Sequence, residues 1–267
     1  MTAFAKIRRM AISAAAILGL SAGAASAAGC GKDASGFEAW KADFAQQHGL
    51  KGAALKAFQG TSYATATIRV DRAVKKAFSG DVQSFIKRRG GAAIVSRGKS
   101  LKKQNAQMFA DIERRYGVPP GVILAIWGME TGFGAAMGNQ NTLSAVATLA
   151  YDCRRPEFFT EHLHGALTLV SRGSLSSASV GAAHGEIGHT QFLPANVVKY
   201  GVDGNGDGKV DLRNRNDALY STANFLRGHG WRAGAGYQGN MGALRGWNAA
   251  SVYQQAIAIL GAQIDGE

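Results

Sequence analysis

The stretch PPGVILAIWGMETGFG, residues 119–134, decides the fold of this 267-residue chain. Proline is tolerated in the first turn of a helix, so Pro119-Pro120 predicts a helix start. Residues 122–129 are almost wholly apolar, and a helix that is apolar on every side is buried. The two glycines that follow predict its end. The sequence therefore predicts a central buried helix whose last turn carries one carboxylate, Glu130.

The position of Glu130 favours a role in acid catalysis. Burial disfavours the charged form of a carboxyl and raises its pKa, and the negative end of the helix dipole acts in the same direction. A carboxyl that stays protonated near neutral pH is what a general acid requires. The flanking glycines allow a bulky substrate to approach the backbone closely. The alternative is a glutamate that only forms a salt bridge or caps a helix.

Apolar residues recur at helical spacing through most of the chain, and strand signals are weak. The fold class is therefore expected to be mainly α with little β. The predicted helices outside the central one cover residues 37–44, 55–58, 70–78, 82–86, 101–116, 142–150, 157–171, 216–228 and 249–263. The region from Gly173 to Arg215 is rich in loops, where binding and catalytic residues concentrate.

Residues 1–28 have the pattern of a secretory signal peptide. Three basic residues precede an apolar run of about 14 residues, which is too short to span a bilayer, and Ala25-Ser26-Ala27 matches a cleavage site. No later stretch is apolar enough to span a membrane. Cleavage lowers the formal net charge from +12 to +9. We therefore expect an exported, periplasmic protein.

The two cysteines, Cys30 and Cys153, would enter an oxidising compartment on export, where pairing is expected. A disulfide would tie the mature N-terminus to the middle of the chain. The alternative is a lipidated Cys30, because Ala27-Ala28-Gly29-Cys30 is similar to a lipobox, although the usual leucine is missing. Lipidation would make the chain an outer-membrane lipoprotein.

The basic composition, with a pI near 9.9, suits a polyanionic partner such as cell-wall polymer, lipid head groups or nucleic acid. The basic residues are scattered, however, and no nucleic-acid-binding motif is present, so no nucleic-acid partner is expected. A solvated basic surface is the alternative. The chain also lacks a Walker loop, a G-x-S-x-G elbow, a C-x-x-C pair and an H-E-x-x-H motif.

Two further stretches carry polar and aromatic side chains suited to sugars. In the glycine-rich loop at residues 185–194, Gln191 can hydrogen-bond a sugar amide or hydroxyl. His189 and Glu186 in this loop could form a base and its partner, or ligate a metal. Near the C-terminus, Trp247-Asn248 and Tyr253 combine stacking rings with an amide. Both stretches could instead simply pack on the core.

Residues 203–211 follow the pattern of an EF-hand calcium loop. Oxygen ligands stand at positions 1, 3, 5 and 9, with glycine at position 6, and position 7 would contribute a main-chain carbonyl. Position 12 is Asn214, where a carboxylate is usual, and Asp217 lies too far on to replace it simply. The alternative is a turn cluster that holds no metal. The candidate ligands are Asp203, Asn205, Asp207, Lys209 and Asp211.

Several separated motifs together resemble the membrane-bound lytic murein transglycosylase B family, which has a lysozyme-like catalytic core. The matching motifs are Tyr116–Pro120, Ile126–Thr131, Met137-Gly138, Ala147–Ala150, Gly188–Pro194, Ala223–Leu226 and His229–Trp231. The resemblance covers residues 37–264. It implies a helical region at residues 29–116 that packs on a lysozyme-like core at residues 117–267. An EF-hand-like loop at residues 203–214 would belong to that core.

The resemblance also implies roles for individual residues. Glu130 matches the family's single catalytic glutamate, and Gln191 a substrate-binding glutamine. Trp247-Asn248 stands where the family has a Tyr-Asn pair, and Tyr253 matches a tyrosine of the cleft. Glu186 replaces a small residue of some members and is given a supporting role in substrate binding. The loop at 203–211 matches the family's metal loop, with Asn214 in place of its last aspartate.

The activity implied is non-hydrolytic cleavage of the β-1,4 bond between N-acetylmuramic acid and N-acetylglucosamine in peptidoglycan. Ordinary glycosidases need two carboxylates, and Glu186 is only a weak candidate for the second. In the family, Glu130 would act as acid and then as base, giving a 1,6-anhydromuramic end. No cofactor is required for this chemistry, although the loop could hold a structural Ca²⁺. The expected protein is a monomer that binds glycan strands, and it meets a membrane only if Cys30 is lipidated.

Two other functions are kept as alternatives. A hydrolytic muramidase would activate water and leave reducing muramic ends. A non-catalytic wall-binding protein would release no soluble fragments at all.

Overall fold

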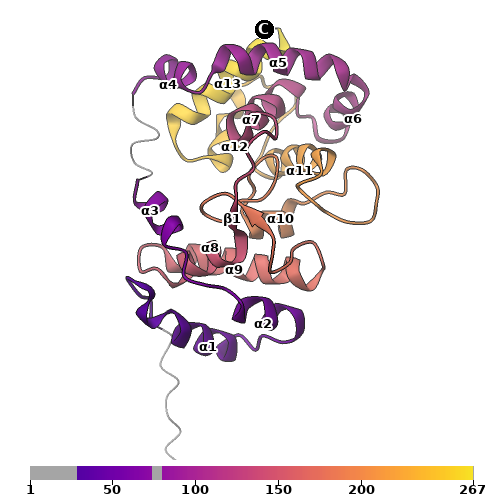
Figure 1. Cartoon of the computed structure of the whole chain (residues 1–267). Helices are drawn as coiled ribbons and strands as arrows, with labels where there is room; N and C mark the ends of the chain where they lie inside the picture. Colours follow the sequence, from indigo (N-terminus) through magenta and orange to yellow (C-terminus); the bar gives the residue numbers. More distant parts are fainter. Residues whose placement is uncertain (1–28, 74–79, 267) are drawn as a thin grey trace, which may run out of the picture.

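The computed structural model describes residues 29–73 and 80–266 and shows a mainly α-helical chain (Figure 1). The predicted signal peptide lies outside the described residues. Strands β1 (Gln140–Asn141) and β2 (Val180–Gly181) form one small antiparallel sheet. The predicted fold class is confirmed. The described helices are η1 (Ala34–Gly36), α1 (Phe37–Gln47), α2 (Gly52–Gln59), α3 (Thr65–Ala73), α4 (Val82–Arg88), α5 (Gly91–Gln104), α6 (Ala106–Tyr116), α7 (Pro120–Thr131), α8 (Thr142–Tyr151), α9 (Pro156–Ser171), α10 (Pro194–Tyr200), α11 (Arg215–Gly228), η3 (Gln238–Asn240), α12 (Met241–Trp247) and α13 (Ser251–Asp265).

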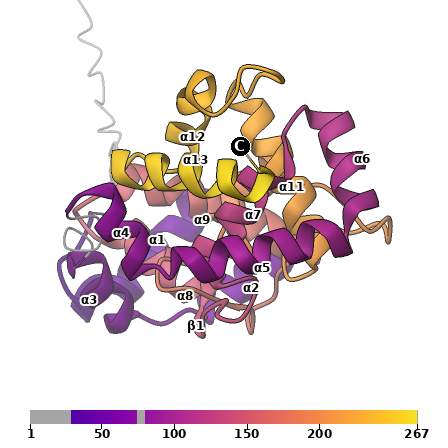
Figure 2. The ribbon, with the colours of Figure 1, turned by 90° about the horizontal axis from the view of Figure 1, so that it is seen from above.

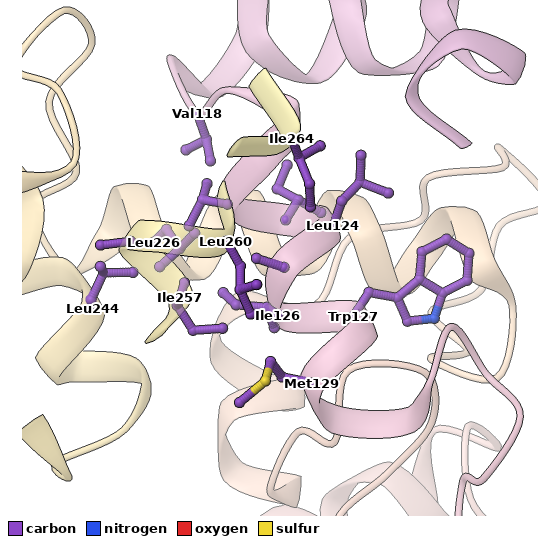
Figure 3. Close-up of a cluster of buried hydrophobic side chains, with 14 of the residues drawn as sticks. Val118, Leu124, Ile126, Trp127, Met129, Leu226, Leu244, Ile257, Leu260 and Ile264 are labelled. Carbon is purple, nitrogen blue, oxygen red and sulfur yellow. The ribbon is translucent and has the colours of Figure 1, made fainter. Parts of the chain in front are cut away.

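Helix α7 is the centre of the largest apolar cluster. Every residue of α7 is buried except Glu130. The helix begins at Pro120 and ends at Gly132, whose φ of 57° is the left-handed geometry that glycine adopts without penalty. It packs most extensively against α13, and Figure 3 shows Ile257, Leu260 and Ile264 meeting the side chains of α7. The central buried helix predicted from the sequence is confirmed.

A second apolar cluster joins α1 and α2 to α8 and α9 (Figure 1). It contains a set of aromatic rings around Trp40 and Tyr151. The Cys30–Cys153 disulfide lies beside it, with a Cα–Cα distance of 4.9 Å. The amide of Gly31 also donates to the carbonyl of Tyr151. The predicted disulfide is confirmed, and it occupies the Cys30 thiol that a lipid would need.

The third apolar cluster lies between α9, α10 and α11 and receives Ile187 and Phe192 from the glycine-rich loop. Helix α10 falls within the region predicted to be loops. Pro194 occupies its first turn, which is the position that suits proline. The helix is only seven residues long, so its apolar pattern is too short to stand out in the sequence.

The prediction of a single helix over residues 101–116 is wrong in one respect, because the helix is interrupted at Asn105. The Asn105 side-chain amide donates to the carbonyl of Leu101 at 2.9 Å. Such a bond competes with the helical backbone pattern. Two helices result, α5 and α6, and Figure 2 shows α5 running beside α13 while α6 turns toward α11.

In the part of the chain that the structure describes, no helix has both the length and the apolar character needed to cross a membrane.

Candidate active site

A cavity of about 410 Å³ opens at the end of α7, between α9, the glycine-rich loop and α12. We call it the cleft. It combines two carboxyl groups with a set of aromatic rings and amides, a lining that suits a polar ligand with ring faces. The cleft is lined by Glu130, Arg155, Phe158, Phe159, His184, Glu186, Gln191, Phe192, Leu193, Asn196, Phe225, Trp247 and Asn248.

Two hydrogen-bond donors bind the carboxyl of Glu130. The hydroxyl of Tyr253 donates to Oε1 of Glu130 at 2.6 Å, and Nε1 of Trp247 donates to the same oxygen at 3.1 Å. These donors come from α13 and from the last residue of α12. The two bonds fix the orientation of the carboxyl and leave Oε2 as the oxygen that can meet a ligand.

The surroundings of Glu130 favour its protonated form. Burial is the largest influence and raises the pKa of the Glu130 carboxyl, and the nearby charge of Glu186 raises it further. The hydrogen bonds from Tyr253 and Trp247 lower this pKa but do not outweigh burial. The same burial, together with Glu130, raises the pKa of Tyr253 well above its ordinary value. The direction of the shift at Glu130 is the one that a general acid requires.

Glu186 lines the same cleft but favours the opposite charge state. Burial raises the pKa of Glu186, but two bonds to His184 outweigh it, so that the pKa is lowered overall. The main-chain amide of His184 donates to Oε2 at 2.8 Å, and its ring Nδ1 lies 3.0 Å from Oε1. The sequence suggested His189 as the partner of Glu186, and this interpretation is wrong because His184 takes that place.

His189 instead fastens the glycine-rich loop to α7. Its carbonyl accepts a hydrogen bond of 2.6 Å from the Thr131 hydroxyl, and Nε1 of Trp127 lies 3.2 Å from its Nδ1. Burial lowers the pKa of His189. His189 is not one of the residues that line the cleft. Its contacts with Thr131 and Trp127 connect the loop to α7, the helix that carries Glu130.

Gln191 lies at the tip of the turn that His189 anchors. The turn is closed by pairing between Ile187 and Phe192. Gln191 has a φ of 57°, a left-handed conformation that is uncommon for a residue with a side chain and that often marks functional sites. Its amide donates to the carbonyl of Gly188 at 2.8 Å, which leaves the amide oxygen available toward the cleft.

Of the three predicted side chains near the C-terminus, two line the cleft and one does not. Trp247 packs edge-on against Phe192 and Phe225 in the wall of the cleft. Asn248 also lines it, although its Oδ1 accepts a bond from the Ala250 amide. Tyr253 is only 3% exposed, so it contacts Glu130 and not the open cleft.

Several lining residues were not identified from the sequence. Arg155, Phe158 and His184 lie far along the chain from Glu130, and no local motif connects them to it. Phe158 is 45% exposed, which is unusual for so large an apolar ring. The exposure of Phe158 becomes informative only once the fold has placed it at the edge of the cleft.

The EF-hand-like loop lies away from the cleft. The carboxylate of Asp203 accepts bonds from the main-chain amides of Gly206, Asp207 and Gly208. Asp217 is fully buried and closes the loop, since Oδ1 accepts from Asn205 and Oδ2 accepts from the amide of residue 211. Across residues 29–73 and 80–266, no three acidic, histidine or cysteine side chains gather as a metal-binding group. Calcium binding by the loop stays a prediction.

The fold and the cleft define an α-helical protein of the lysozyme-like class, with a glutamate of raised pKa at the end of a buried helix. Residues 35–241 match the family model described as "Transglycosylase SLT domain". The match covers most of the chain, which therefore belongs to the transglycosylase SLT-domain family.

Similar proteins of known name agree with this membership. The chain is 38% identical over 121 residues to membrane-bound lytic murein transglycosylase B of Escherichia coli K12, across 45% of this chain. The aligned segment spans only 34% of that relative's length. SltB3 of Pseudomonas aeruginosa, in complex with NAG-NAM-pentapeptide, has a TM-score of 0.78 and 28% identity over 86% of this chain and 80% of its own. E. coli Slt35 in complex with calcium has a TM-score of 0.74, but at 21% identity it supports the fold alone; the match covers 89% of this chain and 96% of that one.

Proposed function

We propose that this chain is a peptidoglycan lytic transglycosylase in which Glu130 is first the acid and then the base. The observation that supports this proposal is the position of Glu130. It is the single unburied residue of α7, it lines an aromatic-walled cleft, and its pKa is raised. Family membership and the similarity to a murein transglycosylase support the same activity.

The proposed reaction needs no water. Glu130 gives its proton to the glycosidic oxygen between N-acetylmuramic acid and N-acetylglucosamine, and the bond from that oxygen to C1 of the muramic sugar breaks. The substrate's acetamido group stabilises the positive charge on C1. The C6 hydroxyl oxygen then bonds to C1 and returns its proton to Glu130, which leaves a 1,6-anhydro end. SltB3 of P. aeruginosa forms a complex with NAG-anhNAM-pentapeptide, which contains such an anhydro sugar.

The aromatic walls and amides of the cleft supply the binding groups that a glycan strand requires. Trp247 and Phe158 offer ring surface, while Gln191 and Asn248 offer hydrogen-bonding groups to amides and hydroxyls. We propose that Gln191, Trp247 and Asn248 contact the sugar directly. Tyr253 would act on the sugar only through Glu130.

The test is product analysis of purified peptidoglycan sacculi treated with the full chain and with Glu130→Gln. The wild type is expected to release fragments with 1,6-anhydromuramic ends, detected by mass spectrometry. Glu130→Gln should keep the fold, checked by circular dichroism, and release none. Release by Glu130→Gln at the wild-type rate would disprove the assignment. Reducing muramic ends would indicate a hydrolytic muramidase, and the absence of any fragment from wild type would indicate a non-catalytic wall-binding protein.

Further properties belong to the same proposal. We propose an exported, periplasmic monomer that acts on glycan strands, with no nucleic-acid partner and with a helical region at residues 29–116 packed on a catalytic core at 117–267. The chemistry requires no cofactor. Slt35 binds calcium. A structural Ca²⁺ in the loop at 203–214 would stabilise the folded protein and take no part in the reaction, because that loop does not line the cleft.

A further inference from the structure

The cleft contains a second carboxyl group whose environment differs from that of Glu130. Glu186 lines the cleft together with Phe158 and Phe159 of α9, and its side chain is 22% exposed. Its two oxygens are both engaged by His184, one by the main-chain amide at 2.8 Å and one by ring Nδ1 at 3.0 Å. These contacts fix the orientation of Glu186 and favour its negative charge.

His184 is itself held between two carboxylates. Its Nε2 lies 3.4 Å from Oδ1 of Asp71, on the side opposite Glu186, and is buried without a well-aligned hydrogen bond. The ring of His184 therefore lies between the two carboxylates, and its contact with Glu186 helps to fix the orientation of that side chain.

Asp71 is almost fully buried and cannot easily lose its charge. Burial raises its pKa, but the guanidiniums of Arg154 and Arg155 outweigh this and hold it below the ordinary range. Arg72 adds a further contact at 3.1 Å. The line of groups thus runs from an arginine cluster through Asp71 and His184 to Glu186 at the cleft surface.

We propose that Glu186 is a second working carboxylate of the cleft, whose negative charge, fixed by His184 and Asp71, keeps the acid proton on Glu130 and stabilises the positive charge that develops on the sugar. This inference rests on the proposed transglycosylase activity. It adds to the single-glutamate scheme a fixed negative charge that needs no proton transfer of its own. Charges placed in advance where charge develops are an effective means of lowering a barrier.

The charged neighbours of both glutamates set the expected pH profile. Glu130 faces Glu186, which raises its pKa, and Tyr253, Trp247 and Arg89, which lower it. Activity should require protonated Glu130 and ionised Glu186, so the plot of activity against pH should be bell-shaped. Its two limbs report the titration of the interacting pair as a whole. The alkaline limb reports loss of the Glu130 proton, and the acid limb reports protonation of Glu186.

The test measures kcat and KM across pH on soluble, uncrosslinked glycan strands. Glu186→Gln should lower kcat by at least roughly tenfold with little change in KM, and its alkaline limb should move to lower pH because Glu130 loses a negative neighbour. His184→Gln should move the acid limb to higher pH, because Glu186 loses its contact with the imidazole ring and keeps only the main-chain amide. Glu157→Gln is the matched control, since it removes an exposed carboxylate that does not line the cleft.

The outcomes separate the inference from the proposed function. If wild type and Glu130→Gln are both inactive on sacculi, the proposed activity fails. If wild type is active, Glu130→Gln is inactive and Glu186→Gln matches wild type in kcat and in both limbs, only the role of Glu186 is overturned. Should Glu186→Gln fail to fold by circular dichroism, His184→Gln decides, because an unchanged acid limb overturns the inference and a shifted limb supports it.

Discussion

The hydroxyl of Tyr253 and the carboxyl of Glu130 share a hydrogen bond of 2.6 Å, although α13 and α7 are far apart in the chain. The bond stabilises the ionised carboxylate, so it lowers the pKa of Glu130 against the larger effect of burial. Glu130 must first give up a proton and then take one back. The Tyr253 hydroxyl can stay hydrogen-bonded to Glu130 in both its protonated and its ionised form, so it can assist both the acid step and the base step.

Tyr253→Phe is therefore expected to shift activity toward higher pH. Loss of the hydroxyl raises the pKa of Glu130 further, so the alkaline limb of the pH–rate profile moves up. A hydrogen bond to a charged group contributes about 1.5–3 kcal/mol, which corresponds to a loss of roughly tenfold or more in kcat where Glu130 must ionise. The measurement is kcat against pH on soluble glycan strands.

Tyr237→Phe provides the control for this change. Tyr237 is also buried and donates to a carboxylate, Asp265, at 2.8 Å. It is not among the groups that chiefly set the pKa of Glu130. Loss of the Tyr237 hydroxyl should lower the free energy of unfolding and leave the dependence of kcat on pH unchanged. Equal pH shifts in both variants would contradict the assigned role of the Tyr253 hydroxyl.

The turn that carries Gln191 depends on Gly188. Its φ is 72°, and an added Cβ would lie 2.0 Å from the carbonyl oxygen of Leu212. Gly188→Ala should cost about 3 kcal/mol or more in the free energy of unfolding, and it should displace Gln191 and reduce activity even where the protein stays folded. Gly173→Ala is the matched control, with a φ of 76° and open space at Cβ, and should cost about 1 kcal/mol. Similar losses of stability in the two variants, measured by urea unfolding, would contradict the predicted close approach.

Sequence reasoning succeeded where one contiguous stretch contains the whole signal. Helix α7 was predictable because its start, its apolar faces and its glycine end lie within sixteen residues, and Glu130 belongs to the same stretch. The surroundings of His184 were not predictable in this way. Asp71 meets His184, and Arg155 meets Asp71, only after α3 and α9 have packed against α8. No local pattern encodes that meeting, since each residue alone resembles an ordinary surface charge.

The disulfide makes a separate prediction about stability. Cys30 and Cys153 are separated by 123 residues, so the bond restricts a large part of the unfolded chain. Replacing both cysteines by serine should lower the free energy of unfolding by about 3–5 kcal/mol. Urea unfolding of the oxidised wild type and of the double variant measures the difference, and wild type in reductant should match the variant. Equal stability of all three would show that the bond does not form in the folded protein.

His162 predicts how stability changes in mild acid. It is 3% exposed and packs against Phe158 and Phe159, and both of its ring nitrogens are buried without a hydrogen bond in the described part of the chain. Burial lowers its pKa below the ordinary 6.5. As pH falls through 6.5, the unfolded chain binds a proton that the folded chain does not, so the free energy of unfolding falls; above 6.5 this contribution is constant.

His162→Leu should therefore lose less stability than wild type between pH 7 and pH 5. Some pH dependence should remain in the variant, because burial also lowers the pKa of His164 and His189. The measurement is the urea midpoint of each protein at several pH values in this range. Parallel curves for the two proteins would mean that His162 becomes protonated within the fold as readily as in the unfolded chain, which its apolar surroundings argue against.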